Sequence, residues 1–206
     1  LLPSDDLYND QDRKSASWKH SGKLSDSVRV RTDVNYVSDS AYFTDLGTDL
    51  NLSNTTHQER VGELLWNKGA WSMLGRAQSF QTIDPSITDI DKPYARLPQL
   101  LLKGGDQVSA GFEPQLSTEL SWFERTVDDG SGPEINGARY RLDPSLAYRI
   151  EEPWGHLTPK IKAGSLLYQL EGSGVTGDEV RTVTVPAFSL DGGLVFERDQ
   201  PGLIQT

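Results

Sequence analysis

Apolar and polar residues alternate along extended stretches of this sequence. Between residues 28 and 36, Val28, Val30 and Val34 occupy even positions, while Arg29 and Arg31 occupy odd ones. Similar alternation occurs at residues 116–123, 139–150 and 157–164. A period of two is typical of a β-strand with one apolar and one polar face. Since no stretch shows a helical period, we expect an all-β chain.

The breaks between these stretches alternate between short and long. Short breaks fall at residues 21–25, 67–69, 104–106, 151–155 and 200–202, and long ones at 38–47, 82–93, 127–137 and 171–179. An antiparallel sheet connected in this way has all its tight turns at one end, as transmembrane β-barrels do. We therefore predict about nine antiparallel strands, often longer than the roughly 5 or 6 residues of ordinary globular strands.

Two local features leave alternatives open. Residues 49–66 form either one long strand or two short strands with a bulge near Gly62. Proline recurs within the alternating stretches, at Pro98, Pro114, Pro144, Pro159 and Pro186. Because proline removes a ladder hydrogen bond, we favour strand entry over a deliberate weakening of strand pairing at these positions.

Composition narrows the functional classes. The 206 residues carry a net charge of −10, which argues against a nucleic-acid partner. The longest apolar runs fall far short of the roughly 20 residues that a membrane-spanning helix needs. The chain has no cysteine, which excludes disulfides, zinc–thiolate sites and cysteine catalysis within it. It has no basic-then-apolar start, so we expect no signal peptide in it.

The polar face of the predicted strands supplies the candidate functional residues. They are Arg29, Arg31, Asp33, Glu119, Arg139, Arg141, Arg149, Lys160 and Lys162. In a barrel this face lines a water-filled lumen, where the cations can meet anionic phosphates or partner loops. The alternative is an ordinary solvated face with cross-strand ion pairs, each worth about 0.2–1 kcal/mol.

No catalytic, cofactor or metal site is expected. His20, His57 and His156 are scattered, and adjacent acidic pairs fall in polar, turn-rich segments. The Gly-x-Ser-x-Gly motif of hydrolases does not occur.

Large aromatic residues are expected mainly near strand ends or turns. They are Trp18, Trp66, Trp71, Trp122, Trp154, Tyr36, Tyr42, Tyr94 and Tyr168. In a membrane barrel they would form interfacial girdles, whereas in a soluble protein they could stack on sugar rings.

An ordered series of phrases resembles the C-terminal barrel of the LptD family of LPS-assembly proteins. The longest phrase is Lys92-Pro93-Tyr94-Ala95-Arg96-Leu97-Pro98-Gln99-Leu100. Others follow the family order at residues 2–6, 18–22, 37–39, 42–43, 79–81, 153–155 and 195–199. The resemblance extends over essentially the whole chain.

The resemblance implies a very large outer-membrane β-barrel of about 26 strands, within the range of single-chain barrels. Residues 1–206 would form a partial barrel domain, an interior arc, since an odd strand count and open edges do not suit a complete barrel. The family's periplasmic domain, lateral gate and disulfides would then lie outside this chain.

The implied function is transport without covalent catalysis or a cofactor. The full protein would receive lipopolysaccharide (LPS) from a periplasmic bridge protein of the LptA type. It would pass the sugar part through the lumen and release the lipid into the outer leaflet of a Gram-negative outer membrane. An LptE-type lipoprotein would plug the barrel. The main alternative is a soluble all-β carbohydrate-binding module, and a β-rich glycoside hydrolase is a more distant one.

Overall fold

The computed structural model describes residues 1–6, 10–46, 56–106 and 111–196. Its centre is one antiparallel sheet of ten strands, whose long strands are neighbours in chain order. These are β3 (Ser15–Lys23), β4 (Val28–Val37), β5 (His57–Lys68), β6 (Trp71–Thr82), β7 (Ala95–Gly105), β8 (Phe112–Glu124), β9 (Asn136–Tyr148), β11 (Gly155–Glu171) and β12 (Val180–Leu194). The short β10 (Ile150–Glu152) pairs with the start of β11. The prediction of an all-β chain with about nine long strands is confirmed.

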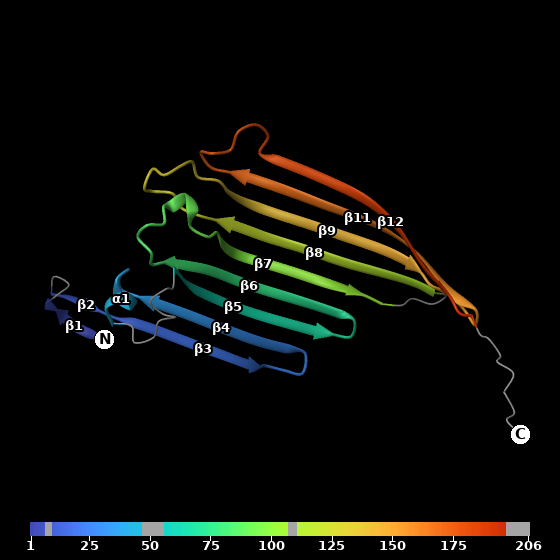
Figure 1. The fold of residues 1–206 in the computed structure, drawn as a ribbon, viewed down its shortest axis with the longest axis horizontal. Helices are drawn as coiled ribbons and strands as arrows, with labels where there is room; N and C mark the ends of the chain where they lie inside the picture. Colours follow the sequence, from blue (N-terminus) through green and yellow to red (C-terminus); the bar gives the residue numbers. More distant parts are fainter. Residues whose placement is uncertain (7–9, 47–55, 107–110, 197–206) are drawn as a thin grey trace, which may run out of the picture.

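The connections alternate between tight and long, as predicted. The turn expected at residues 104–106 is wrong in its bounds, because Gly104 and Gly105 belong to β7 and pair with Leu116 and Gln115 of β8. Figure 1 shows the tight turns at one end of the sheet and the longer connections at the other. Two long connections contain short helices, α1 (Tyr42–Leu46) and η2 (Asp89–Asp91), so the expectation of no helix is wrong there. Helices of about one turn are too short to leave a periodic pattern in the sequence. The predicted turn at residues 200–202 lies outside the described residues.

The strand β5 is continuous through Gly62, which pairs with Ala77 of β6 in an unbroken register. The alternative of two short strands with a bulge at Gly62 is therefore wrong, while residues 49–55 lie outside the described part of the chain. A register irregularity occurs instead around Pro98, between β7 and both of its neighbours. Proline cannot donate to the ladder, so a bulge accommodates it.

Pro144 and Pro186 lie in the interior of β9 and β12. The prediction that prolines mark strand entry is therefore wrong for these two residues and for Pro98 and Pro159, the fourth residue of β7 and the fifth of β11. Pro114, the third residue of β8, lies close to a strand start. Pro144 and Pro186 line a shallow apolar depression of about 660 Å³, together with Ile161 and Phe188.

The two faces of the sheet differ sharply in character. One face, called the apolar face, exposes large hydrophobic side chains, and Leu142, Ile161 and Phe188 are 47%, 58% and 68% exposed. The buried apolar residues of the described chain are Val37, Val61, Ile83, Ala138 and Ala147. Within the described residues no second layer covers the sheet (Figure 1). The closed core that a soluble carbohydrate-binding module needs is therefore absent from this part of the chain.

No helix among the described residues is long and apolar enough to cross a membrane.

A small hairpin of β1 (Leu2–Asp5) and β2 (Gln11–Arg13) is attached to the loop end of the sheet by a buried arginine. The Arg13 guanidinium is 2% exposed and forms ion pairs with Asp5 at 3.3 Å, Asp39 at 2.7 Å and Asp45 at 2.9 Å. Asp39 and Asp45 belong to the connection after β4, so one cation joins the hairpin to this connection. Such a buried charge is tolerated because carboxylates surround it.

Strands β9 and β11 approach closely at Gly137, and a substitution there tests this contact. The φ of Gly137 is +149°, and a Cβ there would lie 2.1 Å from the carbonyl oxygen of Gln169. We expect Gly137→Ala to lower the free energy of unfolding by about 1–3 kcal/mol, measured by urea denaturation of the full protein in detergent.

The matched control is Gly62→Ala, because nothing lies within 4 Å of a Cβ at Gly62. Equal stability losses in the two variants would contradict this account of the β9–β11 contact.

Candidate functional site

The predicted polar residues gather on the face opposite the apolar one, called the polar face. They are Arg29, Arg31 and Asp33 of β4, Glu119 of β8, Arg139 and Arg141 of β9, and Lys160 and Lys162 of β11. Strand alternation and the register of pairing place them on the same side. Arg149 lies just beyond β9, where it pairs with Glu113 at 3.2 Å and Glu151 at 3.1 Å.

One line of side chains crosses this face perpendicular to the strands. The pairing register places its members directly opposite one another on β4 to β9: Arg31, Glu63, Arg76, Gln99, Ser121 and Arg139. These six residues are called the polar row. Opposed residues of antiparallel strands have Cβ atoms about 4.5–5.5 Å apart, so their side chains can interact.

Charge alternates along the first half of the polar row. The Glu63 carboxylate forms two ion pairs, one through each oxygen. Its Oε2 lies 3.1 Å from Arg31 Nη1, and its Oε1 lies 2.6 Å from Arg76 Nη2. Arg76 also donates to the side-chain oxygen of Gln99 at 3.3 Å. Four adjacent strands, β4 to β7, are thus joined by charge-assisted contacts, which are stronger than neutral hydrogen bonds.

Glu119 of β8 connects the remaining members of the polar row. It lies on the same face as Ser121, two residues away along the strand. Its Oε1 accepts hydrogen bonds from Gln99 Nε2 at 2.9 Å, Ser121 Oγ at 2.7 Å and Arg139 Nη2 at 2.7 Å. The Glu119 side chain is only 11% exposed, and Ser121 is fully buried. The Arg139 guanidinium also lies 4.9 Å from the centre of the Phe123 ring. The network therefore stays connected from β4 to β9.

The remaining predicted residues divide between local pairs and a separate groove. Asp33 pairs with Lys19 at 3.5 Å, and it lies 3.9 Å from Arg31. Arg141, Lys160 and Lys162 line a groove between the polar row and the tight-turn end. The structure thus brings Arg31, Glu119 and Arg139 into one network and separates them from these three cations.

The sequence reasoning missed Glu63, Arg76, Gln99 and Ser121. A signal for two of them was present, because the tight turn after Lys68 pairs that residue with Trp71. Counting back from the turn places Glu63 opposite Arg76. Gln99 and Ser121 could not be found this way, because the expected turn at residues 104–106 gives the wrong register: β7 continues to Gly105, which pairs with Gln115.

Some of the large aromatic residues lie at strand ends or turns, and others do not. Trp71 begins β6 and Trp154 lies in the tight turn before β11, as predicted. Trp18 lies in the middle of β3 instead and is 62% exposed.

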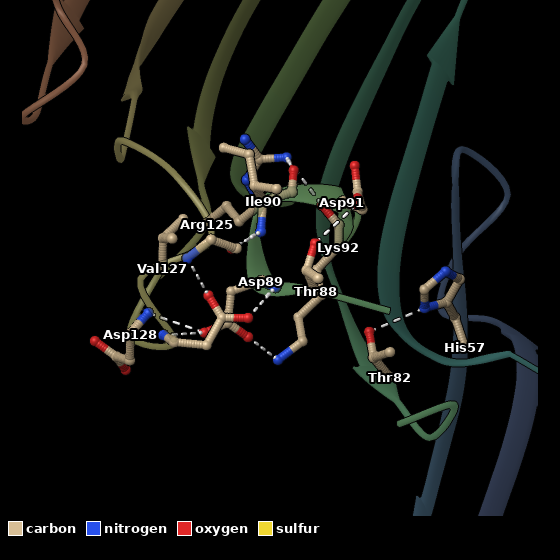
Figure 2. Close-up of polar contacts among 12 residues, drawn as sticks. His57, Thr82, Thr88, Asp89, Ile90, Asp91, Lys92, Arg125, Val127 and Asp128 are labelled. Atoms are coloured by element: carbon tan, nitrogen blue, oxygen red, sulfur yellow. Dashed lines mark hydrogen bonds and ion pairs between the residues drawn. The ribbon is translucent and has the colours of Figure 1, made fainter. Parts of the chain in front are cut away.

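At the opposite end of the sheet, polar contacts join the β6–β7 and β8–β9 connections (Figure 2). The Asp89 carboxylate accepts the backbone N–H groups of Asp128 at 2.9 Å and Asp129 at 3.0 Å, and it forms an ion pair with Lys92. Arg125 donates to the carbonyl oxygens of Ile90 and Lys92. These contacts are called the loop clamp.

The electrostatics of the loop clamp favour ionised aspartates. The ion pair with Lys92 and the donated N–H of Asp128 hold the pKa of Asp89 below its usual value. Hydrogen bonds from the Ser131 hydroxyl, from the Asp89 backbone N–H and from the Ser131 backbone N–H lower the pKa of Asp129. The clamp is therefore formed by carboxylates that remain charged at neutral pH.

The family of LPS transport system D, LptD, matches residues 11–206 of this chain. Among similar proteins, the LPS-assembly protein LptD of Alcanivorax borkumensis is 35% identical over 198 residues, covering 96% of this chain and 26% of that protein. The protein of the same name from Hahella chejuensis is 37% identical over 182 residues, covering 85% of this chain and 22% of that protein. The chain therefore spans about a quarter of the length of these relatives.

Glu119 accepts three side-chain hydrogen bonds, so a substitution there tests whether these contacts stabilise the sheet. We expect Glu119→Gln to lower the free energy of unfolding by about 1–3 kcal/mol, because the partly buried Arg139 loses its counter-charge. Urea denaturation of the full protein in detergent measures this. Glu152→Gln, on the exposed β10, is the control and should change stability by less than about 0.5 kcal/mol. A similar loss in both variants would rule out a special role for Glu119.

The loop clamp should weaken in acid. Because the pKa of Asp89 is lower in the folded state than in the unfolded chain, its contribution is complete above the ordinary aspartate pKa of about 3.9 and disappears as pH falls through the folded value. Protection factors of the Asp128 and Asp129 amides should fall on acidification. In Asp89→Asn they should be low at both neutral and acidic pH.

The control for this measurement is Asp26→Asn in the β3–β4 turn, where Asp26 pairs with Lys23. Protection at Asp128 and Asp129 that is insensitive to both pH and Asp89→Asn would show that this carboxylate does not hold the loops together.

Proposed function

Because the chain belongs to the LptD family of LPS transport, we propose that it forms an arc of an outer-membrane β-barrel that delivers LPS to the outer leaflet. Residues 1–206 are then a partial barrel domain of a longer protein. The full barrel, of about 26 strands in this proposal, lies within the range of single-chain barrels.

The observation that carries this proposal is the single sheet with two unlike faces. The apolar face exposes residues such as Leu100, Leu142 and Ile161, which would be costly in water but favourable against lipid acyl chains. Strands β8, β9 and β11 have 13, 13 and 17 residues. A tilted strand needs about 9–11 residues to cross the hydrocarbon, so these strands are long enough.

The polar face then lines the lumen and contacts the sugar part of LPS. We assign Arg29, Arg31, Asp33, Glu119, Arg139, Arg141, Arg149, Lys160 and Lys162 to this lining. Within it the polar row has a structural role, because the charges of Arg31, Arg76 and Arg139 are compensated by Glu63 and Glu119. Cations outside the row carry the interaction with substrate.

The proposed partners follow from the family. They are LPS, the lipid of a Gram-negative outer membrane, an LptE-type plug lipoprotein and an LptA-type periplasmic bridge protein. The bridge protein would dock on an N-terminal domain outside residues 1–206. The role is transport, with no cofactor and no covalent chemistry on the substrate.

Depletion of the full-length protein in its own host tests the transport role. We expect LPS at the cell surface to fall severalfold, measured by antibody labelling of intact cells, while total LPS per cell is maintained. Expression of the intact gene should restore the label. Unchanged surface LPS after depletion, or a parallel fall in total LPS, would contradict the proposal.

A further inference from the structure

A groove with an excess of positive charge lies on the polar face beside the polar row. It has a volume of about 470 Å³ and is lined by side chains of β7, β8, β9 and β11. The polar and charged residues that line it are Lys103, Gln115, Ser117, Arg141, Asp143, Ser145, Lys160 and Lys162. These eight residues define the basic groove.

Asp143 is the one carboxylate among the residues that line the basic groove. It is shared by two cations, Arg141 at 2.5 Å and Lys162 at 3.9 Å. Lys160 donates to the Gln115 side-chain oxygen at 3.3 Å, and Lys103 has no ion pair with any described residue. Four cations against one carboxylate leave three positive charges uncompensated.

This imbalance distinguishes the basic groove from the polar row. In the polar row each arginine has a carboxylate within ion-pair distance. The whole chain carries a net charge of −10, so the local excess of cations in the basic groove is opposite in sign to the charge of the chain. Cations that converge from three strands repel one another, and the repulsion is relieved when an anion enters between them.

The chemistry of the lining specifies the kind of anion. The ammonium groups and the Arg141 guanidinium can donate charge-assisted hydrogen bonds to phosphate oxygens. The neighbouring Gln115, Ser117 and Ser145 side chains can pair with hydroxyl groups. A volume of about 470 Å³ is within the range of sites for small ligands, roughly 300–1,000 Å³, and exceeds what a lone phosphate requires.

We propose that the basic groove binds the phosphate group of a phosphorylated saccharide. This inference rests on the proposed function, in which the polar face contacts the sugar part of a passing lipid, and it assigns one position on that face to the phosphate. Lys103, Lys160 and Lys162 supply the attraction, and the adjacent amide and hydroxyls hold the sugar.

The test measures binding of glucose 6-phosphate to the full-length protein in detergent by isothermal titration calorimetry. We expect saturable binding that weakens with added salt, and no binding of glucose. The variant K103Q/K160Q/K162Q should bind at least about tenfold more weakly, because it loses three charge-assisted donors. The control K14Q/K23Q/K68Q removes the same charge elsewhere and should bind within about twofold of the unchanged protein.

A second measurement needs no variant. In the unchanged protein, glucose 6-phosphate should protect Lys103 and Lys160 from acylation by an N-hydroxysuccinimide ester, read out by mass spectrometry, while Lys68 reacts at an unchanged rate. This readout decides the question if the triple variant fails to fold.

Three results would overturn the proposal: no binding or protection, equal weakening in both triple variants, or equal affinity for inorganic phosphate and glucose 6-phosphate. The last result would assign the groove to free phosphate. These outcomes are independent of the surface-LPS assay. A severalfold fall in surface LPS on depletion, together with unchanged binding in K103Q/K160Q/K162Q, would reject the groove and retain the transport role.

Discussion

Backbone pairing between antiparallel neighbours places the side chains of this sheet, because no second layer of the described chain packs against it. In a sandwich, an error of one residue in register is resisted by a packed core. In this sheet, a slip of β5 by one residue against β4 would move Glu63 to the apolar face and place Leu64 on the polar face opposite Arg31. The tight turns and the cross-strand side-chain contacts together must therefore determine the register of the strands.

The polar row provides this control by electrostatics. A slip between β5 and β6 would separate Glu63 from Arg76 and leave partly buried charges without partners, which costs more than the pairs contribute when formed. The same reasoning applies to Glu119, whose single oxygen accepts three hydrogen bonds from β7, β8 and β9. The network thus specifies one alignment of the strands, in addition to whatever stability it adds.

The sequence predicted the features that depend on local spacing. Alternation from Val28 to Tyr36 gives the two faces of β4, and the alternating turn lengths give the order and direction of the strands. It could not predict contacts that depend on several registers at once. Arg139 reaches Glu119 through a position on β9 set by a long connection. Gln99 faces Ser121 because β7 continues through Gly104 and Gly105, where the sequence suggests a turn. Asp89 meets Asp128 across two loops whose spacing follows no rule of period.

On β7, β8 and β9 the compensated and uncompensated charges occupy different heights. The polar row crosses these strands nearer the long connections, whereas Lys103, Ser117 and Asp143 lie opposite one another nearer the tight turns. In transmembrane barrels the tight turns face the periplasm. If the proposed barrel has that orientation, an anionic solute entering from the periplasm would meet the uncompensated cations of the basic groove first and the compensated polar row beyond them. In the proposed barrel, this arrangement would attract the solute at entry and bind it less strongly deeper in the lumen.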